Sequence, residues 1–256
     1  MNKMNLYIYM YYQLFNSFTI TRREALMFGA GLFLPSAVYS TARDMTTTIK
    51  KWANGSHAFI VRAKNEKYGC QIVSAREIIG NDFALTQEIQ EKTGAYAVFN
   101  GSFFDRNGLS SGLYGRRGDI KKQFVRGRGE GILYTDKDGQ VKIIGSSGIS
   151  AFRNVMVDAI QVNLLSAGKA RFYRPDNVRL PITFVGLSNN NLVAAVLKKV
   201  SLPLGDEIMR NDYGCNIVVE LGHGDSSSAC DKFGRKSFRR GDSLEQRVPN
   251  FLVLYD

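Results

Sequence analysis

Short runs of apolar, β-branched and aromatic residues, separated by turn residues, dominate the chain. These runs predict strands at residues 57–63, 95–99, 131–135, 141–144, 159–165, 182–187, 192–197, 216–221 and 251–255. Helical spacing occurs only at residues 82–92 and 204–211, and Gly214 marks the end of the second helix. Asp138 and Gly139, between two strand runs, predict a hairpin turn. The pattern predicts an α+β fold with antiparallel or mixed β-sheets and a few short helices.

The N-terminal segment differs from the rest of the 256-residue chain. Arg22 and Arg23 precede an apolar stretch, residues 25–39, that ends in small residues. This stretch is shorter than the roughly 20 apolar residues that span a bilayer. We therefore expect residues 1–42 to be a cleaved export signal of the twin-arginine type, with an uncleaved anchor as the alternative. Residues 43–256 then form one periplasmic or secreted domain without a stable membrane span.

The formal net charge of +11 and the pI of about 9.6 favour an anionic partner. Nucleic acid, a membrane surface and a phosphorylated or acidic glycan all fit that charge. The basic groups, which include Arg126 and Arg128, lack the interleaved aromatic residues of a nucleic-acid module. Export also argues against nucleic acid, so we expect an anionic glycan or sugar phosphate as the partner. The sequence leaves the oligomeric state open.

The three cysteines, Cys70, Cys215 and Cys230, allow one disulfide at most and match no zinc-site spacing. A bridge between Cys215 and Cys230 would pin the loop that lies between them. The alternative, which we favour, is three partly buried free thiols.

The predicted strand at residues 216–221 leads directly into small and chemically active residues. Gly222 and Gly224 permit backbone conformations and close ligand approach that a Cβ would block. Acidic, imidazole and hydroxyl groups accompany them: Glu220, His223, Asp225, Ser226 and Ser227. His223 is one of only two histidines in the chain, the other being His57. This composition indicates a catalytic or binding loop, and the alternative is a Gly/Ser turn that caps the next element.

A second strand, predicted to end at Phe99, leads into a segment of the same kind. Asn100 offers both a donor and an acceptor, and Asp105 offers a carboxylate. Phe103 and Phe104 could form an apolar wall against a sugar face. The alternative is a turn in which Asn100 and Asp105 bind local backbone groups and both phenylalanines belong to the core.

These two segments together resemble motifs of the phosphodiester glycosidase family. The run from Asn100 to Asp105 is similar to the family's Asn-Gly-Gly-Phe-Phe-Asp motif. Further similarities follow in the family's order, at residues 112–113, 131–134, 138–139, 158–169, 181–186, 214–215, 220–226 and 248–253. The resemblance covers most of residues 43–256 and implies a single domain of that family's fold.

The resemblance implies a hydrolase that cleaves a sugar phosphodiester of an envelope or extracellular glycan at the anomeric carbon. Because phosphate is a good leaving group, the rate depends mainly on a carboxylate at the anomeric centre and on donors that hold the phosphate. We expect Asp225 or Glu220 to supply the carboxylate and His223 to move a proton or contact the phosphate. Substrate binding is expected from Asn100, Gly101, Asp105, Gly222, Gly224, Ser226, Ser227, Arg126 and Arg128.

The chain departs from the family motifs where the chemistry is expected. Gly222 replaces an Asp, Glu220 replaces an Asn and Ile182 replaces an Arg. Either Glu220 or Asp225 takes over from the missing carboxylate, or the protein is a catalytically inactive relative. The inactive alternative is a glycan-binding or polysaccharide-assembly protein of the same fold.

Two other kinds of site are disfavoured. A Ser-His-Asp hydrolase needs a special turn to bring His223, Asp225 and Ser226 together, because neighbouring residues of an extended segment point to opposite faces. Asp105, Asp225 and Glu220 suit a hard cation such as calcium, but no spacing fixes a site, so we expect no cofactor. The sequence does not identify the sugar or the aglycone.

Overall fold

The computed structural model describes residues 45–51, 57–64, 68–127, 129–152, 154–165, 178–188, 191–237 and 246–256. All of them belong to Ala42–Asp256, one of the two compact units into which the chain divides. The export signal expected at residues 1–42 lies outside the described residues. Within the described part, none of the helices has the length and apolarity needed to cross a membrane.

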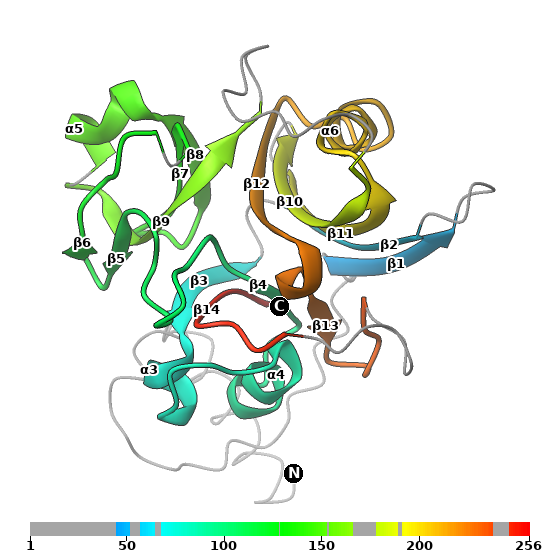
Figure 1. Cartoon of the computed structure of the whole chain (residues 1–256), viewed down its shortest axis with the longest axis horizontal. Helices are drawn as coiled ribbons and strands as arrows, with labels where there is room; N and C mark the ends of the chain where they lie inside the picture. Colours follow the sequence, from blue (N-terminus) through cyan, green and yellow to red (C-terminus); the bar gives the residue numbers. More distant parts are fainter. Residues whose placement is uncertain are drawn as a thin grey trace, which may run out of the picture. The chain divides into compact units, whose positions relative to one another are not determined.

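Two β-sheets form the body of this unit (Figure 1). Over the described residues, the larger sheet has ten strands in the order β1-β2-β11-β10-β12-β9-β5-β6, with β7 paired to β9 and β8 paired to β7. All of its strand pairs are antiparallel. Its strands are β1 (Met45–Lys51), β2 (His57–Lys64), β5 (Tyr114–Arg116), β6 (Asp119–Lys122), β7 (Gly131–Asp136), β8 (Val141–Gly145), β9 (Met156–Leu164), β10 (Leu180–Ser188), β11 (Asn191–Val200) and β12 (Ile217–His223).

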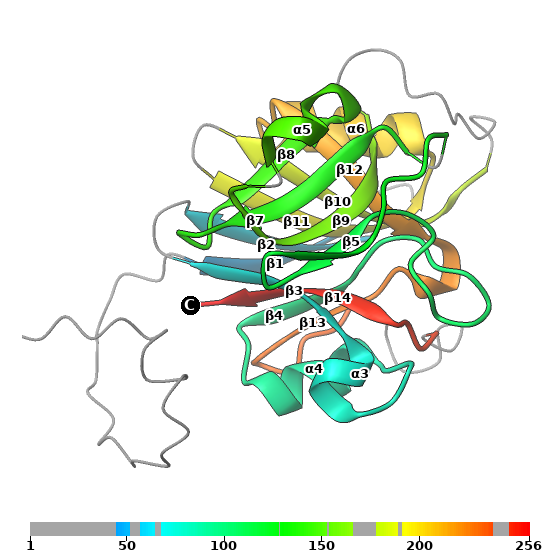
Figure 2. The ribbon, with the colours of Figure 1, turned by 90° about the vertical axis from the view of Figure 1, so that its left-hand side faces the viewer.

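The smaller sheet lies against one face of the larger sheet (Figure 2). Its described strands are antiparallel, in the order β13 (Ala229–Asp231), β4 (Ala97–Asn100), β14 (Asn250–Tyr255) and β3 (Gly69–Ser74). The described helices are short and lie at the outer faces of the sheets and in the connections: α3 (Ala75–Ile79), α4 (Thr86–Thr93), η1 (Ser146–Gly148), α5 (Ile149–Phe152), α6 (Leu202–Asn211) and η2 (Gly224–Ser226).

Burial of apolar side chains on both faces of each sheet explains this layering. The largest core cluster lies between the sheets, where the rings of Phe59 and Phe99 meet edge to face with centroids 5.9 Å apart. A second cluster, which includes Phe184 and Met209, lies between the larger sheet and α6. A third, which includes Ile89, lies between the smaller sheet and the helices α3 and α4. The sheets therefore form a sandwich with helices on its outer faces.

The α+β prediction is confirmed, and each predicted strand overlaps an observed strand. The hairpin at Asp138 and Gly139 is also confirmed, because Gly139 has a φ of 77° between β7 and β8. The prediction of only two helices is wrong, since α3 and α5 are helical as well. These helices have five and four residues, too few to show a helical repeat in the sequence. Strands β1, β3, β5, β6 and β13 were not predicted either.

The three cysteines are free and buried, which confirms the interpretation that we favour. Cys215 packs in the cluster under α6, whereas Cys230 packs in the cluster under α3 and α4. The two thiols lie on opposite outer sides of the sandwich, so no bridge pins the loop between them. Burial raises the pKa of the Cys215 thiol to about 11.

Two segments of chain pass from one sheet to the other and position the candidate site. Strand β4 of the smaller sheet ends at Asn100, and the chain continues to β5 of the larger sheet. Strand β12 of the larger sheet ends at His223, and the chain continues through η2 to β13 of the smaller sheet. Because β13 pairs with β4, the two crossings lie side by side.

Candidate functional site

The two polar segments singled out in the sequence meet at these crossings. The backbone N–H of Ser228 donates to Oδ1 of Asn100 over 3.0 Å, and the Thr183 hydroxyl donates to the same oxygen. A Cβ at Gly222 would lie 2.9 Å from Nδ2 of Asn100. Phe103 then lies beside His223, with ring centroids 5.6 Å apart. The structure thus brings together residues more than a hundred positions apart in the chain.

A β-bulge at the end of β12 determines which side chains share a face. Glu220 pairs with Phe184 of β10, but Gly222 pairs with the next residue, Thr183, so Leu221 is an extra residue. In a regular strand, Glu220 and His223 would point to opposite faces. The bulge places both on one face of the sheet, and turns Gly222 toward Asn100.

Glu220 and His223 form a pair at this point of the fold. Oε1 of Glu220 lies 2.6 Å from Nδ1 of His223. The Glu220 side chain is 5% exposed and the His223 side chain 25% exposed, so the carboxylate lies behind the ring. The other carboxylate oxygen, Oε2, accepts a hydrogen bond of 2.9 Å from Nδ2 of Asn163 on β9. A buried acid thus orients a half-buried imidazole, which is an arrangement suited to proton transfer.

The turn after His223 is closed by its own hydroxyl groups. Ser226 Oγ donates to the His223 carbonyl and Ser227 Oγ donates to the Gly222 carbonyl, each over 3.0 Å. Gly224 has a φ of 74°, a conformation that favours glycine. Asp225 is exposed on this turn. Ser226 is directed at a backbone carbonyl rather than at the imidazole, and the acid beside His223 is Glu220, so the geometry is not that of a Ser-His-Asp triad.

Asn100 is more deeply buried than a substrate contact would require. It is 2% exposed, and its amide nitrogen donates to the Gly101 carbonyl over 2.9 Å. Gly101 is equally tightly packed, because a Cβ there would overlap Asn250. Asn100 joins the two sheets through Thr183 of β10. The predicted part of Asn100 and Gly101 in substrate binding stays a prediction.

The rest of the segment after Asn100 divides between the site and the core. Asp105 is exposed, and its Oδ1 accepts from the N–H groups of Asn107 and Leu109 over 2.9 and 3.0 Å. Phe104 packs in the outer cluster of the smaller sheet and against Phe83. Asp105 therefore shapes a turn, and of the two phenylalanines only Phe103 lies beside His223.

Arg126 is exposed on a loop that β9 holds in place. Gln161 of β9 accepts from the N–H groups of Leu113 and Val125, over 2.9 and 3.0 Å. Its amide nitrogen donates to the carbonyls of Val125 and Gly129, over 2.7 and 2.9 Å. Arg128 lies outside the described residues. The loop is anchored two residues from Asn163, next to the partner of Glu220.

The sequence did not single out Asn163 or Gln161, although both contribute to the site region. The available signal was a pair of amide side chains at alternate positions of a strand whose neighbouring residues, Ile160, Val162 and Leu164, are apolar. Buried amides in such a run need hydrogen-bond partners. Within the described residues, no three His, Cys, Asp or Glu side chains come together in a way that could hold a metal ion.

Comparison with known proteins gives a likeness of fold. No family model and no curated protein matches the chain. The catalytic domain of zebrafish N-acetylglucosamine-1-phosphodiester alpha-N-acetylglucosaminidase, auto-inhibited by its pro-peptide, matches with a TM-score of 0.58 and 13% identity. That match covers 83% of this chain and 82% of the zebrafish chain.

Two bacterial structures are similar to a comparable degree. A hypothetical protein from Synechocystis has a TM-score of 0.59 at 11% identity, covering 82% of this chain and 61% of that one. A Burkholderia pseudomallei protein described as a candidate exported protein has a TM-score of 0.53 at 10% identity, covering 79% and 74%. At these identities the likeness shows the fold alone. The chain shares the fold of the zebrafish catalytic domain.

Proposed function

We propose that this protein is a hydrolase that cleaves a sugar phosphodiester at the anomeric carbon. The observation that carries the proposal is the buried Glu220 carboxylate, 2.6 Å from the half-buried His223 imidazole, at the junction of the two polar segments. The fold shared with a phosphodiester glycosidase catalytic domain supports the same reaction class. The substrate is an anionic envelope or extracellular glycan, in agreement with the net charge of +11.

In the proposed reaction, the bond between the anomeric carbon and the phosphate oxygen breaks, and water adds to the carbon. The phosphate monoester leaves as an anion and needs little help from an acid. His223 takes the proton of the attacking water, and Glu220 orients the ring and balances its positive charge. Asp225, on the exposed turn after His223, supplies negative charge for the oxocarbenium-like transition state. Arg126 and Arg128 bind the phosphate.

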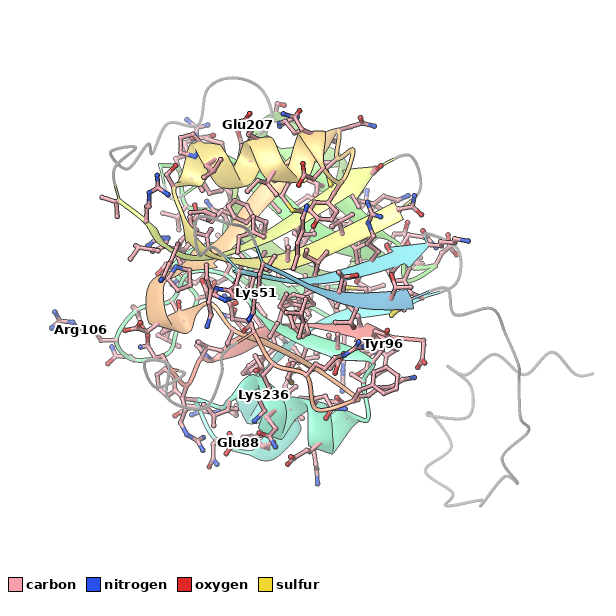
Figure 3. All side chains as sticks on the ribbon, turned by 90° about the vertical axis from the view of Figure 1, so that its right-hand side faces the viewer. Lys51, Glu88, Tyr96, Arg106, Glu207 and Lys236 are labelled. Atoms are coloured by element: carbon pink, nitrogen blue, oxygen red, sulfur yellow. The ribbon has the colours of Figure 1, made fainter. Side chains whose placement is uncertain are left out.

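The test is release of free sugar from a panel of sugar 1-(methyl phosphate) diesters by the purified protein. Removal of a general base costs about 10²-fold to 10⁴-fold in kcat, so we expect losses in that range for His223→Gln and Glu220→Gln. His57→Gln, at the other histidine, and Glu207→Gln, on the outer side of α6 (Figure 3), serve as matched controls. Turnover that survives in folded His223→Gln would exclude the assignment.

A second candidate function is glycan binding without turnover. Gly222 favours this function, because the family motif has an Asp at this position. The fold leaves no room for that Asp, since its Cβ would lie 2.9 Å from Nδ2 of Asn100. Under this alternative, the diesters bind to the protein with no sugar released, and His223→Gln changes affinity instead of rate. Equilibrium binding of the same diesters, measured beside the hydrolysis assay, separates the two functions.

We also propose that the protein works in the periplasm or outside the cell. Arg22 and Arg23 before an apolar stretch support export, as does the likeness to a protein described as a candidate exported protein. Replacement of both arginines by lysine should retain a reporter fused after residue 42 in the cytoplasm. Unchanged export of that fusion would contradict the twin-arginine assignment.

A further inference from the structure

We infer that Asn163 is a positioning residue that fixes the tautomer of His223 by holding Glu220. The catalytic meaning of this inference rests on the proposed function, whereas its structural content does not. Asn163 and Glu220 are directly paired across β9 and β12. Both are buried, at 6% and 4% exposure, so neither has water as a ready substitute for its partner.

The two oxygens of Glu220 have different partners, and this division fixes the carboxylate. Oε2 accepts from Nδ2 of Asn163 over 2.9 Å, and Oε1 lies 2.6 Å from Nδ1 of His223. Rotation of the carboxylate away from His223 would break both contacts and leave a charged oxygen buried without a donor. A buried group without its partner is strongly disfavoured. Asn163 therefore holds Oε1 against the imidazole.

The held carboxylate decides which ring nitrogen carries the proton. An ionised carboxylate only accepts hydrogen bonds, so Nδ1 of the neutral imidazole must be the protonated nitrogen. Nε2 is then the basic nitrogen, and it is the atom that takes a proton from water in the proposed reaction. Loss of Asn163 releases Glu220, and the ring then distributes between its two tautomers.

Gln161 shows what a structural amide on the same strand does instead. It lies two residues before Asn163 on β9, and its side chain makes hydrogen bonds to backbone atoms of Leu113, Val125 and Gly129. Its loss would loosen those loops, and Arg126 with them, without touching Glu220. Asn163, in contrast, donates to an acidic side chain that has an imidazole as its other partner.

The experiment reads the tautomer of His223 from ¹⁵N shifts of histidine-labelled full-length protein, without any substrate. The chain has two histidines, so His57→Gln assigns the signals. We expect the Nδ1–H form in the wild type and a mixture in Asn163→Leu, which keeps the side-chain size but lacks the donor. Asn216→Leu, an exposed Asn next to the start of β12, should keep the wild-type signals.

Two further measurements make the result decisive. Glu220→Gln should lose the Nδ1–H preference by itself, and adding Asn163→Leu should then change nothing more, because both act through the same contact.

With an active enzyme, Asn163→Leu should lower kcat by roughly 10-fold to 100-fold, as for partners that orient a ligand, with KM little changed. If Asn163→Leu does not fold, Asn163→Ala provides the same reading. Wild-type ¹⁵N shifts in either folded variant would overturn the inference, whether or not the protein hydrolyses any diester.

Discussion

Two buried polar groups join the larger sheet to the smaller sheet, and they differ in charge. In the first, which we call the charged bridge, Asp158 of β9 accepts from the N–H of Ile72 on β3 over 3.3 Å and binds Nη1 of Arg116 over 2.7 Å. In the second, the neutral bridge, Asn100 of β4 accepts from Thr183 on β10 and from the N–H of Ser228. The charged bridge is neutralised by a permanent cation, whereas the neutral bridge carries no charge.

The difference explains why chemistry is expected at only one of the two places. The Asp158 side chain is 1% exposed, and its partner Arg116 is 10% exposed and always protonated. Arg116 cannot act as a base, and it binds both oxygens of Asp158. Near the neutral bridge, the acid Glu220 pairs instead with the imidazole of His223, which is 25% exposed and can carry a proton on either ring nitrogen.

The largest expected effect comes from breaking the charged bridge. Arg116→Met leaves Asp158 buried without its cation, and removal of one partner of a buried pair costs about 3–5 kcal/mol. Urea denaturation should show this loss in the free energy of unfolding. The matched control is Arg76→Met, because the Arg76–Asp82 pair is 74% and 53% exposed. Exposed pairs contribute about 0–1 kcal/mol. Equal losses in both variants would show that the bridge does not join the sheets.

A smaller loss is expected from crowding the neutral bridge. Gly222→Asp inserts the carboxylate that the family motif has at this position, but its Cβ would lie 2.9 Å from Nδ2 of Asn100. Asn100 must then move, and such overpacking costs about 1–3 kcal/mol. Thermal unfolding measures the loss, and sugar release should fall with it.

Gly139→Asp is the control for Gly222→Asp, because Gly139 has a φ of 77° and no atom within 4 Å of a Cβ. It bears only the cost of a left-handed conformation, about 1 kcal/mol, which Asp tolerates well. Sugar release should stay at the wild-type level in this hairpin variant. A stable Gly222→Asp protein with faster turnover would mean that the missing carboxylate, and not Glu220 with His223, limits the reaction.

The same contrast shows how far the sequence determines the structure. Alternating or continuous apolar runs predicted the strands of the sheets, such as residues 192–197 within β11, because burial of those side chains requires a strand there. The short segments β5 and β13, of three residues each, depend on neighbouring strands for their hydrogen bonds and have no pattern of their own. Strand β1 has mainly exposed positions and therefore little apolar repeat.

The candidate site was visible in the sequence only as two polar segments after strands. Which acid lies beside His223 depends on the bulge at Leu221, and that bulge is defined by pairing with β10, about 35 positions earlier in the chain. No local pattern contains this register. The burial of Asn100 is likewise set by Thr183 and Ser228, which approach it from other strands. The roles assigned to these residues in catalysis and binding stay predictions.

Removing one donor from the neutral bridge should have a modest effect. Thr183→Val keeps the shape of the side chain but leaves Asn100 with the Ser228 N–H as the remaining donor to Oδ1. A neutral hydrogen bond contributes about 0.5–1.5 kcal/mol, and urea denaturation should show a loss in that range. Thr48→Val, on the exposed face of β1, should change the free energy of unfolding by no more than about 0.5 kcal/mol. No difference between the two variants would mean that Thr183 does not support Asn100.

The smallest expected effect is a pH dependence in the charged bridge. Glu77 of α3 lies 3.3 Å from Nε of Arg116. Burial raises the pKa of the Glu77 carboxyl, but the Ser74 N–H and the charge of Arg116 outweigh it, so that the pKa lies below its ordinary value of 4.5.

A lowered pKa in the folded protein stabilises the fold above the unfolded value, and this stabilisation is lost as the pH falls through the folded value. Glu77→Gln should therefore lower the free energy of unfolding at pH 7, by less than about 1 kcal/mol for a partly exposed pair. The difference from the wild type should shrink as the pH falls below 4.5. Urea denaturation across that range measures it. A difference that persists unchanged in acid would assign the effect of Glu77 to packing, and the charged bridge would then consist of Asp158 and Arg116 alone.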